Sequence, residues 1–138
     1  MIVPFEHFLQ NNDVKKAFIN RELAKSLIRD MDERIEKSLI LDENIFSKII
    51  FENIYDGLRN FCDALLVLEG YKSYSHQASI SFLLKKGFSI IIVEKIEQFR
   101  QKRNGSKYYG LPISAGDAKE IKEFYLKNKE KFDKRRIK

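Results

Sequence analysis

The stretch Phe46-Ser-Lys-Ile-Ile-Phe-Glu-Asn-Ile-Tyr-Asp-Gly-Leu-Arg-Asn-Phe-Cys-Asp-Ala-Leu-Leu-Val-Leu68 decides the fold. Its apolar side chains recur every three or four residues, which is the period of an α-helix. The main stripe consists of Phe46, Ile50, Ile54, Leu58, Phe61, Leu65 and Leu68. Ile49, Cys62 and Leu66 widen it. The spacing therefore predicts the central and most buried helix of the protein.

The ends of this helix carry capping signals. Asp42 is a suitable N-cap, and Gly70 can end the helix in a left-handed conformation. Upstream, residues 1–12 are predicted to be an irregular lead-in. A second amphipathic helix is expected from about residue 13 or 20 to 41. Its apolar residues repeat every four positions between charged ones, at Leu23, Leu27, Met31, Ile35 and Leu39.

Three further helices are predicted downstream. One begins at Ser73 or Ser75 and stops at Gly87, with Ile80, Leu83 and Leu84 inward. The next spans residues 88–103 with Val93, Ile96 and Phe99 inward and Gly105 just past its end. After a break at Leu111-Pro112, Ser114 and Asp117 resemble a capping box that opens the last helix, which buries Ile121, Phe124 and Tyr125 and runs to Phe132. The fold class is thus all-α, an antiparallel bundle of about five helices in a single domain over 1–138.

Composition and charge exclude several classes. Charged residues make up 33% and hydrophobic ones 43% of the chain, which is typical of a soluble globular protein. No apolar run is long enough to span a membrane, and no basic region precedes an apolar N-terminal segment, so a cytoplasmic location is expected. Cys62 lies in the apolar helical stripe and is interpreted as a core residue.

The net charge of +6 is concentrated in a basic C-terminal tail, residues 127–138, which holds seven Lys or Arg against two acids. Such a tail can attract nucleic acid, or it can be a frayed and solvated helix end.

Metal and cofactor sites are not predicted. The chain has only two histidines and one cysteine, without metal-ligand spacing, and it has no glycine-rich phosphate loop.

The candidate functional stretch is Arg100-Gln-Lys-Arg-Asn-Gly-Ser-Lys-Tyr-Tyr-Gly110. Guanidinium groups can fork onto phosphate oxygens, an amide can orient them, and phenols can stack or donate. The candidate contacts to nucleic acid are Arg100, Lys102, Arg103, Lys107 and Tyr109. The structural alternative is a charged helix end whose tyrosines pack back on the bundle.

Acids of the central helix are the candidate partners of this stretch. Glu52 and Asp56 are four residues apart and share one helix face. If the second and fourth helices of the bundle run antiparallel, these acids approach Arg103 and can orient it or transfer protons. A solvated face or a structural ion pair is the alternative. The tyrosines at 71 and 74 are interpreted as sealing a helix corner, and His76 as a packed residue at a helix start or a phosphate donor.

The run from Tyr55 to His76 resembles the HEPN superfamily of helical domains. The matching features are Ala64-Leu65-Leu66, Gly70 and the Ser75-His76 pair, followed later by Arg103-Asn104. The resemblance covers about residues 20–130. It implies a helical bundle, often a homodimer, and in catalytic members a metal-independent ribonuclease in which an arginine stabilises phosphate charge and a histidine aids proton transfer.

This chain departs from that pattern at one position. Tyr108 stands after the spacer where the motif has histidine, and a tyrosine, with an ordinary pKa of about 10, is a poor acid or base at neutral pH. Phosphate recognition by Arg103 and Asn104 is expected to remain. The candidate catalytic residues are Arg103, Asn104, Tyr108, Glu52 and Asp56.

Three hypotheses follow. The leading one is a domain that binds RNA or a nucleotide-bearing partner, with weak or no ribonuclease activity. The second is a non-catalytic interaction module, such as the partner of a small nucleotidyltransferase in a toxin–antitoxin-like pair, for which an exposed apolar patch away from Arg103 would argue. The third is an active metal-independent endoribonuclease. No cofactor is expected.

Overall fold

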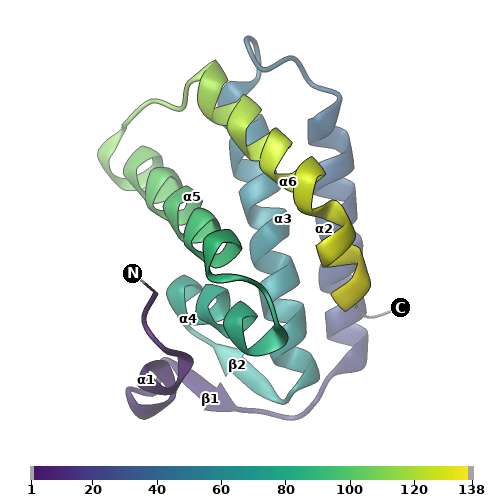
Figure 1. Cartoon of the computed structure of the whole chain (residues 1–138), viewed down its shortest axis with the longest axis vertical. Coiled ribbons are helices and arrows are strands. Elements are labelled where there is room, and N and C mark those ends of the chain that lie inside the picture. Colours follow the sequence, from purple (N-terminus) through teal and green to yellow (C-terminus); the bar gives the residue numbers. More distant parts are fainter. Residues whose placement is uncertain (1, 137–138) are drawn as a thin grey trace.

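The long helix α3 (Ser47–Leu68) runs through the middle of the protein, as the computed structural model shows for residues 2–136 (Figure 1). Ile50, Ile54, Leu58 and Phe61 on this helix are fully buried. The helix α2 (Arg21–Leu39) packs along one side of α3. On the other side lie α5 (Ile90–Tyr109), which runs antiparallel to α3, and α4 (His76–Ser81). The last helix, α6 (Ala115–Arg135), also packs on α3.

The remaining elements are short. The helix α1 (Phe5–Gln10) precedes the strand β1 (Val14–Lys16), which pairs antiparallel with β2 (Tyr71–Ser73) to form a two-stranded ribbon. The 3-10 helix η1 (Phe82–Lys86) continues α4 and ends at Gly87, whose φ of 86° is left-handed. The buried apolar residues of these elements and of the long helices form one core. The prediction of an all-α bundle is confirmed.

Gly57 explains how closely α2 and α3 approach. A Cβ atom at this position would lie 2.7 Å from Cγ1 of the buried Ile35 on α2, closer than real Cβ contacts allow. Glycine inside a helix costs about 1 kcal/mol relative to alanine. Here that cost is offset by the close packing of the two helices.

Gly105 does not end α5, contrary to the prediction. The helix continues to Tyr109 and ends at Gly110, whose φ of 68° is left-handed. Beyond that turn Leu111 folds back over the helix, and a Cβ at position 105 would lie 3.1 Å from Cδ1 of Leu111. Gly105 therefore makes room for the returning chain, and it is Gly110 that stops the helix.

The start of α3 also differs from the prediction. The helix begins at Ser47 after Phe46, and Asp42 caps a turn by accepting a hydrogen bond from the backbone of Asn44 at 2.7 Å. Phe46 and Ile49, which were expected in the buried stripe, are exposed. The helix α1 lies in the lead-in that was expected to be irregular. The strand β1 occupies positions for which a helix starting at about residue 13 was one of two predictions, so that earlier start is wrong and the helix begins at Arg21. The strand β2 was not predicted.

The predicted basic tail is helical through Arg135. The Arg135 guanidinium lies 4.6 Å from the ring centroid of Phe88 and donates to the carbonyl of Lys86 at 3.0 Å. Arg136 donates to both carboxylate oxygens of Asp32, at 2.7 and 2.8 Å. These two cations thus fasten the end of α6 to η1 and α2, while the last two residues of the tail lie outside the described part.

None of the helices within residues 2–136 has the combination of length and apolar character needed to cross a bilayer.

Candidate functional site

The C-terminal half of α5 carries a row of polar residues on one side, and the continuation of the helix beyond Gly105 adds Lys107 and Tyr108 to this row. Residues three or four apart on a helix are neighbours on its surface. The residues that share this spacing are Arg100, Arg103, Asn104, Lys107 and Tyr108. A stretch that was expected partly beyond the helix is therefore a single helical face, and it meets α3 and α4.

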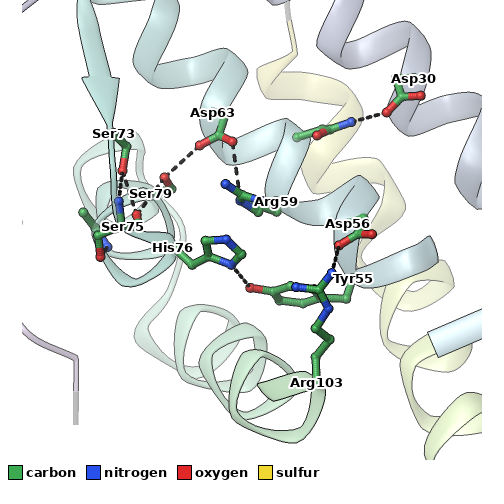
Figure 2. A network of polar contacts seen from close by, with 12 residues as sticks. Asp30, Tyr55, Asp56, Arg59, Asp63, Ser73, Ser75, His76, Ser79 and Arg103 are labelled. Carbon is green, nitrogen blue, oxygen red and sulfur yellow. Dashed lines mark hydrogen bonds and ion pairs between the residues drawn. The ribbon is translucent and has the colours of Figure 1, made fainter. Parts of the chain in front are cut away.

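Arg103 is held between two residues of α3. One of its terminal nitrogens lies 3.4 Å from Oδ1 of Asp56, and its guanidinium lies 5.8 Å from the ring centroid of Tyr55 (Figure 2). The side chain is only 14% exposed. Its Nε is buried and has no hydrogen-bond partner among the described residues. Arg103 therefore has unused hydrogen-bonding capacity. A buried donor without a partner costs about 1–3 kcal/mol.

His76 lies next to this arginine. The hydroxyl of Tyr55 and Nδ1 of His76 are 3.2 Å apart and share a hydrogen bond, and the two rings are nearly parallel (Figure 2). The start of α4 fixes the histidine, because the Ser75 side chain accepts a hydrogen bond from the backbone of Ala78. Tyr55 is fully buried, which raises the pKa of its phenol.

The surroundings of His76 disfavour its charged form. Burial, as the largest cause, and the positive charges of Arg59, Arg103 and Arg100 together lower the pKa of His76 to about 4. The imidazole is therefore neutral at pH 7. The arginines around His76 already supply positive charge, so this environment favours an added negative charge over an added positive one.

Arg59 completes the group of arginines. Its Nε is buried without a hydrogen-bond partner, and the nearest carboxylate, on Asp63, is 3.7 Å away. Asp63 accepts a hydrogen bond from Ser79 at 2.7 Å, and burial raises the pKa of this carboxyl group. Arg100 is paired with Glu97 on its own helix. Figure 2 shows Arg59 and Arg103 on either side of the His76 and Tyr55 pair.

A shallow hollow of about 190 Å³ opens beside these residues. It is lined by Ser75, His76, Gln77, Arg100, Asn104 and Tyr108. Sites for drug-sized ligands usually measure about 300 Å³ or more. The hollow therefore suits one small group, such as a phosphate, rather than a whole cofactor.

The structure brings some predicted residues together and separates others. Asp56, Arg103, Asn104 and Tyr108 lie at the site, but Glu52 pairs with Lys48 at 3.8 Å instead of approaching Arg103. Lys102 pairs with Asp117 at the start of α6, at 3.2 Å. The Lys107 ammonium lies 5.5 Å from the Tyr108 ring centroid, and Tyr109 is exposed and does not line the hollow.

Three residues of the site were not among the predicted site residues. Tyr55 and Arg59 lie four positions apart on α3, one turn apart on the face that also carries Asp56 and Asp63. The sequence shows that spacing, but a tyrosine and an arginine one turn apart are common on helices and do not by themselves indicate a site. His76 was interpreted as a packed residue at a helix start or as a phosphate donor, and only the docking of α4 against α3 and α5 places it among the arginines.

A larger concavity lies elsewhere. A groove of about 630 Å³ between α5 and α6 is lined by Ile91 and Phe124 together with lysines and glutamates. Its charges have both signs and partly satisfy each other, as in the pair of Lys95 with Glu120 at 3.1 Å. The smaller hollow is the better candidate for a site, because Arg100 lines it and the nearby Arg59 and Arg103 each have a buried Nε without a hydrogen-bond partner among the described residues.

The described residues contain no group of three or more His, Cys, Asp or Glu side chains placed to hold a metal ion. No protein-family model, no curated protein and no solved structure matches the chain.

Proposed function

We propose that the hollow between α4 and α5 binds a phosphate group of an RNA chain. One observation carries the proposal. Arg59 and Arg103 flank a neutral histidine, and the Nε atoms of both arginines are buried without a hydrogen-bond partner. Arg100 lines the hollow, and Arg59 and Arg103 lie close to it without being part of its lining, so an anion in the hollow would be attracted by all three cations.

Each residue has a distinct role in this proposal. Arg100 and Arg103 present guanidinium groups to the phosphate oxygens, as planar forks that can donate two parallel hydrogen bonds. Asn104 lines the hollow and donates its amide hydrogens. Tyr108 is 65% exposed, so its ring is accessible for stacking on a base.

Ribonuclease activity is a separate question at the same site. Cleavage requires a group that accepts the proton of the attacking 2′-hydroxyl and a group that returns a proton to the leaving 5′-oxygen. His76 lines the hollow and is neutral, whereas the expected position of the motif histidine holds Tyr108. If the protein cleaves RNA, His76 is the residue we assign to proton transfer, and a bound phosphate would raise its pKa toward the useful range.

The experiment measures binding and cleavage of a labelled single-stranded RNA in EDTA. The variants are Arg103→Ala, His76→Asn and Tyr108→Phe, and Arg29→Ala is the matched control. Arg29 is exposed on α2, on the opposite side of α3, so its removal takes away the same charge without touching the hollow.

We expect Arg103→Ala to weaken binding about 10-fold or more and Arg29→Ala to weaken it less than 2-fold. Cleavage that is lost in His76→Asn but kept in Tyr108→Phe would establish the ribonuclease with His76 at its centre. Equal binding by Arg103→Ala and Arg29→Ala would reject the phosphate site.

An exposed apolar segment supports a second candidate function. Phe18 is 96% exposed and the adjacent Ile19 is also exposed, both on the segment that joins β1 to α2, and Leu23 is exposed in the first turn of α2. Adjacent exposed apolar side chains are typical of a surface that another protein covers. This favours the interaction module, with a nucleotidyltransferase or a second copy of the chain as partner, if no RNA binding is measured.

A further inference from the structure

An exposed aromatic residue immediately precedes the lining of the hollow along the chain. Tyr74 is 61% exposed, and it precedes Ser75 and His76, both of which line the hollow. The sequence-based interpretation had placed this ring in a sealed helix corner. The neighbouring Tyr71 does pack in this way, against Phe5 at a centroid distance of 5.5 Å, but Tyr74 does not.

The backbone that carries Tyr74 is fixed on both sides. Its N–H donates to the carbonyl of Asp13 at 2.8 Å, which extends the pairing of the β-ribbon. Across Tyr74, the Ser73 hydroxyl donates to the carbonyl of Ser75 at 2.7 Å and accepts from the N–H of Ser75 at 3.2 Å. The exposed ring therefore projects from an anchored turn and not from a loose loop.

Two lysines approach this ring from opposite strands. Lys15 and Lys72 are directly paired in the β-ribbon, and their ammonium groups lie 5.7 and 5.3 Å from the centroid of Tyr74. Like charges directly opposite each other destabilise a strand pair. Neither lysine has a carboxylate within ion-pair distance among the described residues. The ribbon thus holds an uncompensated pair of positive charges around an accessible aromatic face.

A positive surface with accessible aromatic rings is the arrangement that single-stranded nucleic acid requires. Bases of a single strand can leave their neighbours and stack on a side chain, at about 1–3 kcal/mol per base, while lysines follow the backbone. In a duplex the bases are already stacked on each other, so a ring at the surface offers them little.

We infer that the β-ribbon is a base-stacking platform, and that the ligand of the adjacent hollow is therefore a single-stranded stretch of RNA. This inference rests on the proposed function. One base stacks on Tyr74, Lys15 and Lys72 move from the ring onto the flanking phosphates, and a neighbouring phosphate enters the hollow at His76 and Arg100. Positions 74 and 76 are two residues apart, at most about 7 Å between Cα atoms, so one strand can contact both.

The test compares three ligands: a 12-nucleotide single-stranded RNA, the same sequence in a duplex, and inorganic phosphate. The variants are Tyr74→Ala, Tyr74→Phe and the double variant Lys15→Gln/Lys72→Gln. The matched control for the double variant is Lys119→Gln/Lys127→Gln on α6, where both lysines are exposed and the same charge is lost. Far-UV circular dichroism verifies that each variant is folded.

For single-stranded RNA we expect Tyr74→Ala to weaken binding about 10-fold and Tyr74→Phe to bind like the wild type, because the ring face is kept. The lysine double variant should make the slope of log affinity against log salt shallower by about 1.4, and the α6 control should leave the slope nearly unchanged. The duplex should bind more weakly than the single strand, and Tyr74→Ala should not alter its affinity.

Two outcomes separate failure of the platform from failure of the phosphate site. If Tyr74→Ala binds single-stranded RNA like the wild type, while Arg103→Ala loses both RNA and phosphate, the platform is wrong and the hollow stands. If the wild type binds neither RNA nor phosphate, the proposed function fails, and this inference fails with it. Equal affinity for single strand and duplex would also overturn the platform.

Discussion

Two polar clusters lie on different sides of α3, and they are built differently. On the α2 side, one carboxylate oxygen of Asp30 accepts hydrogen bonds from Arg34 at 2.8 Å and Asn60 at 2.6 Å. Arg34 also donates to Asn53 at 3.1 Å. The guanidinium of Arg34 lowers the pKa of Asp30, which is the usual result for a carboxylate with good partners.

On the α4 and α5 side, the balance is reversed. Arg59 and Arg103 each have one carboxylate at 3.4 Å or more and a buried Nε without a partner. Burial raises the pKa of Asp63 and lowers that of His76, so both groups are shifted toward their neutral forms. The network around Asp30, in which the donors and acceptors are paired with each other, stabilises the fold. A network with spare cationic donors beside a hollow is instead suited to an anion from outside.

The largest expected effect tests the open cluster. Arg103→Leu removes the spare donor and fills its space with an apolar side chain. We expect RNA affinity to fall about 10- to 100-fold, because a charge-assisted hydrogen bond is worth about 1.5–3 kcal/mol. The free energy of unfolding should fall by no more than about 1 kcal/mol, because Asp56, which loses its cation, is partly exposed to solvent. Urea unfolding and RNA titration measure the two quantities, and a large loss of stability would show that Arg103 is structural.

The second effect tests the closed cluster. Asp30→Ala leaves Arg34 and Asn60 without their common acceptor, so we expect the free energy of unfolding to fall by about 1.5 kcal/mol. RNA affinity should stay within about 2-fold of the wild type. Glu36→Ala, which removes an exposed acid from the same helix, is the control and should change stability by less than about 0.5 kcal/mol. If Asp30→Ala altered RNA affinity as strongly as Arg103→Leu, the distinction between the two clusters would be lost.

The pH dependence of stability also differs between the clusters. The pKa of His76 is about 4 in the folded protein and 6.5 ordinarily, so the unfolded chain binds more protons between these values. Its contribution is fully present above about pH 6.5 and is lost as the pH falls toward 4. Asp30, whose pKa is lowered, contributes stability that is lost only below its ordinary pKa of 3.8.

The His76 contribution is isolated by comparison with His76→Asn, because the raised pKa of Asp63 acts in the opposite direction at low pH. We expect the wild type to lose about 1 kcal/mol more than His76→Asn between pH 7 and 4.5, a modest value because the imidazole is only partly buried. Unfolding by urea at both pH values provides the measurement. Parallel pH profiles of the two proteins would contradict the assigned environment of His76.

The smallest effect concerns the acid that faces Arg103. Packing and the Tyr55 ring also hold this arginine, so Asp56→Asn should leave it in place and remove a negative charge that competes with phosphate. RNA affinity should rise about 2- to 3-fold, and stability should change by less than about 0.5 kcal/mol. A drop in affinity would mean that Asp56 is needed to orient the guanidinium.

The sequence predicted the helices whose apolar period is long and regular. The stripe from Ile50 to Leu65 is buried as expected, and Val93, Ile96 and Phe99 on α5 are buried as well. The two strands of the β-ribbon have three residues each, too few for an alternating pattern to be visible. Gly105 was misread because its reason is a tertiary contact with Leu111, which the local sequence does not reveal.

The site was predicted only where two helices suffice to define it. The prediction that antiparallel helices bring Asp56 to Arg103 is confirmed, since each residue lies on the side of its helix that faces the other helix. Glu52 has the same periodicity but lies one turn away, where Lys48 is the nearer cation. His76 joins the site only through the relative placement of α3, α4 and α5, and a periodicity along one helix carries no information on such an arrangement.

The close contact at Gly57 has a consequence for which parts of the protein open locally. Neighbouring helices with a short connection and no gap between their backbones are the part of a fold whose amides exchange with solvent most slowly. The short α4 and the β-ribbon share fewer contacts with the bundle, so they should open at lower free energy. The α2–α3 pair then stays folded while the segment that carries His76 opens and closes again, without unfolding of the whole chain.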